Sequence, residues 1–411
     1  MFEAKSPFER LRALLAGTEP GASPIDLTVG GPRHAPPAFI KHVIAEHADE
    51  FIAYPTIVGT ADFQRAAHGY LQRRYGTGEW FQRLGALLPL SGSREGLFFA
   101  ALAARDWLKK PDPTVLFANP FYQTYPASVH GVGAEPVPLA AKMPGGILPD
   151  WDSVPAETLE RAIAYYVASP SNPQGTCATL ADWHELIDRA ERHNFLLLSD
   201  ECYSDLYREH IGPPPGILNA VAERQDALNH VLMFHSLSKR SNLAGMRVGF
   251  VAGGADVMST MRDFRNQAAP QVPTPLQAAA AAAYDEETHV VENRRLYDEK
   301  CAMADDILAP VLGPIAPPAG FFLWLPTAPL GLGEDDEVAV ATLWRETGVR
   351  TVPGSYLALT PPGQQNPGRG YLRLALVADA TVTKEALGRV RTLADRGQVH
   401  VAVEGMERGV F

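Results

Sequence analysis

Short, almost entirely apolar segments alternate with helix-like segments between about residues 60 and 265, and this alternation constrains the fold more than any other feature. Strands without polar positions are typical of a mostly parallel sheet that is covered by helices on both faces. Helix-like segments, such as residues 180–193, separate the apolar segments and supply these layers. The expected strands lie at residues 114–118, 164–168, 195–198, 231–235 and 248–252. The sequence therefore predicts an α/β domain.

The chain changes character after residue 288. Residues 320–325 (GFFLWL) and 371–377 (YLRLALV) have strand-like sequences, and helix-like segments lie between and after them. We expect a large domain with a mostly parallel central sheet at residues 51–288 and a smaller α+β domain at residues 289–411. The N-terminal segment, residues 1–50, is expected to contribute to the small domain. No polar, flexible linker marks the boundary, so the two domains are expected to pack closely.

A long helical pattern, at about residues 275–308, is predicted to lead out of the large domain. It contains the alanine run at residues 278–283. Because alanine favours helix and has a small side chain, this run is typical of a closely packed helix.

Composition limits the classes of function. The 411 residues carry a formal net charge of −11, whereas surfaces that bind nucleic acid gather Lys and Arg against phosphates. No run of about 18 apolar residues is present, and the N-terminus lacks the apolar core of a secretory signal. Cys177, Cys202 and Cys301 show neither zinc nor disulfide spacing. We expect a cytoplasmic protein without a metal site, a nucleic-acid partner or a membrane segment.

Lys239 lies just after an expected strand, in FHSLSKRSNLAGMRVG. A lysine forms Schiff bases with carbonyl compounds when burial and cationic neighbours lower its pKa. Ser236 and Arg247 are close enough in sequence to bind one phosphate, the arginine through two hydrogen bonds. Taken alone, this pattern also fits a surface lysine. The segments that follow the other strands favour a site.

Asp200 ends the apolar run FLLLS, and Tyr203 follows it in SDECY. A buried carboxylate needs a cation, and the pyridinium nitrogen of a pyridoxal cofactor is one that it keeps protonated. Tyr203 can hydrogen-bond the 3′-oxygen of the same ring, and so can Asn172 in the rigid turn SNPQG. The alternatives are a helix N-cap for Asp200 and an ordinary loop for Asn172.

Two further segments are typical of a phosphate and a ring site. Ser93 and Arg94 lie in LSGSREG, at an expected helix start where N–H groups and the helix dipole favour a phosphate. Tyr122, in NPFY, can stack on a flat ring, although a core aromatic is the common alternative. In an open α/β sheet, segments at strand ends meet at one edge, where ligands bind. Together they predict a pyridoxal-phosphate site.

From about residue 25 to residue 390, these motifs resemble the fold-type I pyridoxal-phosphate aminotransferases of class I/II. The resemblance implies that Lys239 carries the cofactor as a Schiff base and moves the substrate proton. It implies that Asp200 binds the pyridine nitrogen and that Tyr122 stacks on the ring. The remaining cofactor contacts that it implies are Asn172 and Tyr203 for the 3′-oxygen, and Ser93, Arg94, Ser236 and Arg247 for the phosphate.

The resemblance also implies a homodimer and a substrate site. Tyr54, in AYPTIVG, matches a tyrosine that reaches the phosphate of the neighbouring subunit, so the active sites are expected to be shared. Arg373, in YLRLALV, matches the arginine that binds the substrate α-carboxylate; the alternative is a strand arginine that faces solvent. Gly31 and Asn172 are the other expected substrate contacts. Gly31 stands where many relatives have an acidic residue.

Within the family, the phrases SGSREGLFF, NPFYQTY, ECYSDLY, SLSKRSN, ENRRLY and NPGRG resemble proteobacterial N-succinyl-diaminopimelate aminotransferases of lysine biosynthesis. This implies ping-pong transfer from N-succinyl-LL-2,6-diaminopimelate to 2-oxoglutarate. The alternatives are an aminotransferase for aspartate, aromatic amino acids or LL-diaminopimelate, and a pyridoxal-phosphate lyase. A catalytically silent binding module is disfavoured because Lys239, Asp200 and Arg247 are all present.

Overall fold

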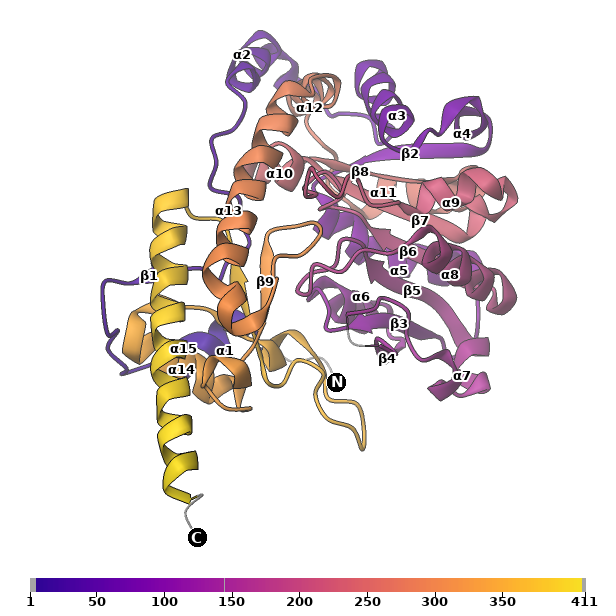
Figure 1. Ribbon diagram of the computed structural model, residues 1–411. Helices are drawn as coiled ribbons and strands as arrows, with labels where there is room; N and C mark the ends of the chain where they lie inside the picture. The colour runs from indigo at the N-terminus through magenta and orange to yellow at the C-terminus, as the bar shows by residue number, and fades with distance from the viewer. Residues whose placement is uncertain (1–4, 144, 409–411) are drawn as a thin grey trace.

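A computed structural model describes residues 5–143 and 145–408. Its centre is a seven-stranded sheet in the order β2-β8-β7-β6-β5-β3-β4 (Figure 1). β8 is antiparallel to its neighbours β7 and β2, and the other neighbouring strands are parallel. The mostly parallel sheet is therefore confirmed. Its strands are β2 (Gly85–Leu90), β3 (Thr114–Asn119), β4 (Glu135–Ala140), β5 (Ala162–Ala168), β6 (Leu196–Asp200), β7 (Val231–Ser236) and β8 (Gly249–Gly254).

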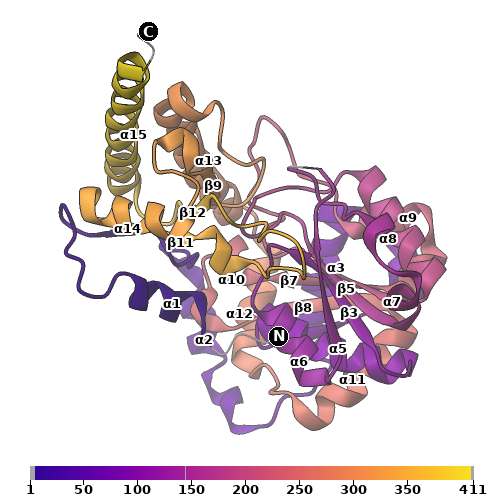
Figure 2. The same cartoon turned by 90° about the horizontal axis from the view of Figure 1, so that it is seen from below.

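Helices cover both faces of this sheet. Alternate side chains of each buried strand accordingly enter two different hydrophobic clusters. In β5, Tyr165 and Val167 pack on one side, while Ala164 and Tyr166 pack on the other. Figure 2 shows α5, α6 and α11 on one side of the strands, with α8 and α9 opposite. One layer contains α5 (Ser93–Leu108), α6 (Thr124–Val132) and α11 (Ala255–Ala268). The other contains α3 (Ala61–Tyr75), α8 (Leu180–His193), α9 (Ile217–Glu223) and α12 (Thr274–Asp285).

A second hydrophobic unit lies beside the large sheet. It has a three-stranded antiparallel sheet in the order β11-β12-β9 and a parallel pair of β1 and β10. Because β1 comes from the start of the chain, the N-terminal segment contributes to this unit. The strands are β1 (Ile25–Asp26), β9 (Phe322–Pro326), β10 (Val349–Arg350), β11 (Val352–Pro353) and β12 (Tyr371–Ala375). The helices are α1 (Pro7–Leu14), α13 (Thr288–Leu312), α14 (Asp336–Thr347) and α15 (Ala380–Arg408).

One part of the N-terminal segment packs elsewhere. Helix α2 (Phe39–Glu46) lies against α12, and Ile40 joins the core of the large sheet. The division into residues 1–50, 51–288 and 289–411 stays a prediction.

The helix expected at residues 275–308 is two helices. Helix α12 ends at Asp285, and Glu286 adopts an extended conformation with φ −98° and ψ 125°. The Glu286 carboxylate then accepts hydrogen bonds from the N–H groups of Thr288 (2.7 Å) and His289 (3.0 Å). These bonds satisfy the first turn of α13, so a new helix begins there.

Along residues 5–143 and 145–408, no helix is long and apolar enough to cross a membrane. Cys177, Cys202 and Cys301 are free cysteines. The cytoplasmic location and the absence of a nucleic-acid partner stay predictions.

Candidate active site

A cavity of about 920 Å³ lies where β5, β6 and β7 end, between the large sheet and the smaller unit. Side chains of both units line it. Every predicted site residue except Tyr54 lies on its wall: Gly31, Ser93, Arg94, Tyr122, Asn172, Asp200, Tyr203, Ser236, Lys239, Arg247 and Arg373.

Lys239 lies in the short helix α10 (Leu237–Arg240), which directly follows β7. Its ammonium group donates a hydrogen bond to the Gly30 carbonyl and lies 5.7 Å from the centre of the Tyr203 ring. Burial lowers the pKa of Lys239 to about 8, and the charges of Arg373 and Arg247 also act to lower it. A larger fraction of the amine is therefore neutral and nucleophilic near neutral pH than for an exposed lysine.

Asp200 is the last residue of β6 and is 7% exposed. Its carboxylate accepts hydrogen bonds from the Tyr125 hydroxyl (3.0 Å) and the Cys202 N–H (3.3 Å). Within the described chain it has no salt bridge, and burial raises its pKa. No helix begins at Asp200, so it is not a helix N-cap. A buried carboxylate at a cavity wall without a cation fits a protonated pyridine nitrogen.

Another group of residues on the cavity wall is suited to a phosphate. Helix α5 begins at Ser93, and its N-cap Gly92 has φ +83°. The Arg247 guanidinium lies against Gly92, in space that a Cβ atom would fill. The Ser236 and Ser238 hydroxyls lie 2.9 Å apart on the same wall. A helix N-terminus, an arginine and two hydroxyls are together well suited to one dianion.

Arg94 has a different environment from these phosphate-site groups. Its Nε donates a hydrogen bond to the Tyr122 hydroxyl at 2.7 Å, and its guanidinium lies 5.7 Å from the centre of that ring. The side chain is exposed at the cavity wall. Arg94 therefore brings a positive charge to the side of the cavity that Tyr122 forms.

Arg373 extends from β12 into the same cavity and is 5% exposed, so it does not face solvent. Its Nη1 donates to Asn172 Oδ1 (2.9 Å), and its Nη2 donates to the Thr28 carbonyl (2.7 Å). Its Nε has no hydrogen-bond partner in the structure. Burial lowers the pKa of Arg373 to about 10. A buried guanidinium without an ion-pair partner in the described chain fits a substrate carboxylate.

Tyr54 lies outside the cavity and is fully exposed. The neighbouring Ile52 (93% exposed) and Phe51 (54% exposed) add apolar surface beside it. None of these three side chains lines the cavity.

Two residues on the cavity wall were missed by the sequence reasoning. Tyr125 donates to Asp200 from α6, and Ser238 supplies a second hydroxyl beside Ser236. Tyr125 lies three residues after Tyr122 in NPFYQTY, and its N–H donates to the Tyr122 carbonyl at 2.9 Å, so a single turn brings the centres of the two rings within 5.9 Å. That spacing was the signal available for Tyr125, and the S-x-S-K pattern was the signal for Ser238.

Comparison with known proteins agrees with this geometry. A model of the family "Aminotransferase class I and II" matches residues 22–390. The chain belongs to this family. It is therefore a pyridoxal-phosphate-dependent transaminase of fold type I, as the sequence predicted.

Individual relatives differ in the substrates that their names give. The LL-diaminopimelate aminotransferase of Syntrophobacter fumaroxidans is 30% identical over 390 residues, which is 94% of this chain and 95% of that protein. An aminotransferase structure from Neisseria meningitidis has a TM-score of 0.86 and 33% identity, covering 95% of this chain and 97% of that one. A probable N-succinyldiaminopimelate aminotransferase from Thermus thermophilus has a TM-score of 0.79 and 25% identity, covering 94% and 100%.

Proposed function

We propose that this transaminase transfers the amino group of N-succinyl-LL-2,6-diaminopimelate to 2-oxoglutarate, a step of lysine biosynthesis. The observation that carries the proposal is the charge of the cavity. Its acidic lining residues are Asp200 and Glu95, and Glu95 forms two 3.0 Å hydrogen bonds with Arg265. The cavity wall of the described chain thus has no free carboxylate for a distal ammonium group, whereas Arg94 brings a positive charge.

This charge pattern supports the N-succinyl compound over LL-diaminopimelate as the substrate. LL-Diaminopimelate carries an ammonium group at its far end, and that group needs an anionic partner. In the N-succinyl compound the far ammonium is replaced by a neutral amide that carries a further carboxylate. Gly31, on the cavity wall, supplies no acidic side chain. The N-succinyl compound is therefore the better match to this wall.

The cavity residues have the following roles in the proposed reaction. When bound, pyridoxal phosphate supplies the electron-withdrawing ring that weakens the Cα–H bond of the substrate. Lys239 would bind the cofactor carbonyl and move the proton, and Asp200 would keep the ring nitrogen protonated. Arg373 and Asn172 orient the substrate carboxylate. Tyr122 would stack on the ring, Tyr203 and Asn172 would contact its 3′-oxygen, and Gly31 would lie beside the substrate. Ser93, Ser236 and Arg247 would hold the phosphate, whereas Arg94, which donates to Tyr122, would supply the positive charge for the distal carboxylate of the substrate.

The proposed assembly is a homodimer with shared active sites. Tyr54, Ile52 and Phe51 form an exposed apolar patch. Such a patch favours a protein interface, and the role of Tyr54 in the neighbouring subunit's phosphate site depends on that interface.

A half-reaction screen tests the substrate. The holoenzyme is mixed with N-succinyl-LL-diaminopimelate, LL-diaminopimelate, glutamate, aspartate or an aromatic amino acid, and the visible absorbance of the bound cofactor is followed. We expect fast loss of absorbance with the succinylated compound and with glutamate, together with conversion of the cofactor to its amino form. Fast reaction with aspartate, an aromatic amino acid or LL-diaminopimelate, and none with the succinylated compound, would contradict the proposal. Product formation without the amino form of the cofactor would indicate a lyase.

The phosphate site gives a separate prediction for Gly92→Ala. A Cβ atom at position 92 displaces the Arg247 guanidinium and strains a backbone with φ +83°. Loss of a charge-assisted hydrogen bond costs about 1.5–3 kcal/mol, or a roughly 10- to 100-fold higher Kd for pyridoxal phosphate. Equilibrium titration of the apoprotein with pyridoxal phosphate measures the Kd. The control is Gly388→Ala in α15, where no atom lies within 4 Å of the added Cβ and the Kd should not change. Equal Kd values for both variants would refute the assignment of Arg247.

A further inference from the structure

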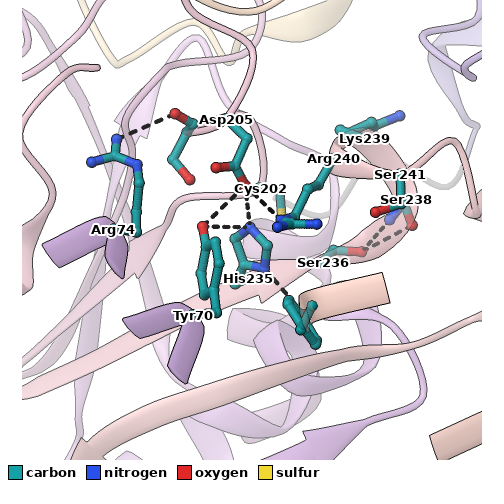
Figure 3. A network of polar contacts seen from close by, with 12 residues as sticks. Tyr70, Arg74, Cys202, Asp205, His235, Ser236, Ser238, Lys239, Arg240 and Ser241 are labelled. Carbon is teal, nitrogen blue, oxygen red and sulfur yellow. Dashed lines mark hydrogen bonds and ion pairs between the residues drawn. The ribbon is translucent and has the colours of Figure 1, made fainter. Parts of the chain in front are cut away.

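A network of buried polar side chains lies beneath the turn that carries Lys239 (Figure 3). Its hub is Asp205, which follows β6. Oδ2 of Asp205 lies 3.0 Å from the Tyr70 hydroxyl, 3.0 Å from Nε2 of His235 and 3.5 Å from Nε of Arg240. Nδ1 of His235 lies 3.2 Å from the Tyr284 hydroxyl. Asp205, His235, Arg240, Tyr70 and Tyr284 are all buried, so water does not replace these contacts.

The protonation states follow from burial and from these partners. Burial acts to raise the pKa of Asp205, but the hydrogen bond from His235 and the charge of Arg240 outweigh it and lower the pKa. Burial lowers the pKa of His235, so its imidazole is neutral. With the proton on Nε2, His235 donates to Asp205 and accepts from Tyr284 through Nδ1. The negative charge of Asp205 then balances Arg240, whose Nη2 also binds Glu287 at 2.8 Å.

The network joins the two segments that present the reacting groups. Arg240 is the residue after Lys239, and His235 lies one residue before Ser236. Asp205 lies two residues after Tyr203 and five after Asp200. The backbone of Asp205 is also held, since its carbonyl accepts a hydrogen bond from Arg294 of α13 at 3.1 Å. A shift of Asp205 therefore changes the separation between Lys239 and the segment of Asp200.

We propose that Asp205 is a positioning residue that holds Lys239 at its working distance from Asp200 and Tyr203, through Arg240 and His235. The proposal rests on the proposed roles of Lys239 and Asp200, but not on which amine is the substrate. Proton transfer depends steeply on the separation of the reacting atoms. A buried network in which one carboxylate oxygen has hydrogen bonds with Tyr70 and His235 and an ion pair with Arg240 fixes such a separation better than a mobile side chain does.

Glu201 provides a matched control. It lies on the same segment, is fully buried and is four residues from Asp205. Its Oε1 accepts hydrogen bonds from the Ser199 hydroxyl and the Ile217 N–H, both at 2.9 Å. None of these partners belongs to the turn of Lys239. Loss of the Glu201 charge therefore tests what loss of any buried carboxylate does to this segment.

The test compares Asp205→Asn, Tyr70→Phe and Glu201→Gln with the wild-type holoenzyme. We expect Asp205→Asn to lower kcat of the half-reaction roughly 10- to 100-fold, with KM within about threefold. Its apoprotein should also bind pyridoxal phosphate covalently at a correspondingly lower rate, measured by absorbance without substrate. Tyr70→Phe removes one hydrogen bond to Asp205 and should show a smaller change in the same direction. Glu201→Gln should retain both rates.

Two outcomes overturn the proposal. The first is that Asp205→Asn keeps both kcat and the rate of cofactor attachment within about threefold of the wild-type values. The other is an equal loss of both rates in Asp205→Asn and Glu201→Gln. If Asp205→Asn does not fold, Tyr70→Phe with unchanged rates overturns the proposal, and Tyr70→Phe with lowered rates supports it. The amino donor in these half-reactions is any amine that the wild-type protein accepts. The test therefore remains valid even if the proposed substrate is wrong.

Discussion

Lys239→Ala is expected to lower the rate of transamination on the order of 10⁴-fold, the upper range for loss of a general acid–base group. In the proposed mechanism, the variant loses both the amine that would bind the cofactor carbonyl and the base that would remove the substrate proton. Asp200, Arg247 and the N-terminus of α5 remain, so the protein should still bind pyridoxal phosphate without a covalent bond. Single-turnover absorbance changes with the best wild-type donor measure the rate. Mass spectrometry after borohydride reduction should find no cofactor attached to the chain.

Lys110→Ala is the control for this variant. Burial lowers the pKa of Lys110 as well, but its ammonium group donates to the carbonyls of Ala162 and His193, at the opposite end of β5 from the cavity. Its half-reaction should proceed at the wild-type rate. A Lys239→Ala protein that turns over as fast as Lys110→Ala would disprove the role of Lys239.

Asp200→Asn is expected to lower kcat about 10²- to 10³-fold, as the loss of one preorganised electrostatic group does in other active sites. Asparagine keeps the size of Asp200 and can still bond Tyr125 and the Cys202 N–H, but it cannot keep the ring nitrogen protonated. The measurement is kcat of the half-reaction. A cofactor analogue with a permanently positive ring nitrogen should restore much of the lost rate.

Thermal unfolding separates a loss of kcat in Asp200→Asn that is due to chemistry from one that is due to misfolding. Burial raises the pKa of Asp200 in the folded apoprotein above its unfolded value, so the ionised carboxylate opposes folding as the pH rises. Near neutral pH, the apoprotein of Asp200→Asn should therefore have a Tm no lower than that of the wild type. A low Tm together with a low kcat would indicate that the loss of activity is due to misfolding. An unchanged kcat would contradict the proposed role of Asp200.

Burial and strand ends explain what could be predicted from the sequence. The strands β3, β5, β6, β7 and β8 lie inside the sheet, so their all-apolar sequences were visible, and the polar residues after β5, β6 and β7 marked the cavity. The edge strands β2 (GALLPL) and β4 (EPVPLA) were not predicted. Edge strands tolerate Gly and Pro, and because these residues are also typical of turns, the two segments did not have the sequence of a strand.

Other features depend on contacts between distant segments, which a local pattern does not contain. Asp205 and Arg240 look like ordinary surface charges in sequence, because their partners Tyr70 and Tyr284 lie on other helices. The division between α12 and α13 depends on where the Glu286 carboxylate points. Such features need the tertiary structure.

The hydrogen bonds of the N-terminal segment have a consequence for the order of folding. The Thr28 carbonyl holds Arg373, which is 345 residues away, and the Gly30 carbonyl holds Lys239, which is 209 residues away. Arg373 can therefore meet the Thr28 carbonyl only after most of the chain has been synthesised, whereas Lys239 can meet the Gly30 carbonyl earlier. The large sheet can form earlier, because its strands end at Gly254. Cofactor capture during synthesis is thus expected to precede competence for substrate, since Arg373, the residue proposed to bind the substrate carboxylate, is the last part of the site to be made.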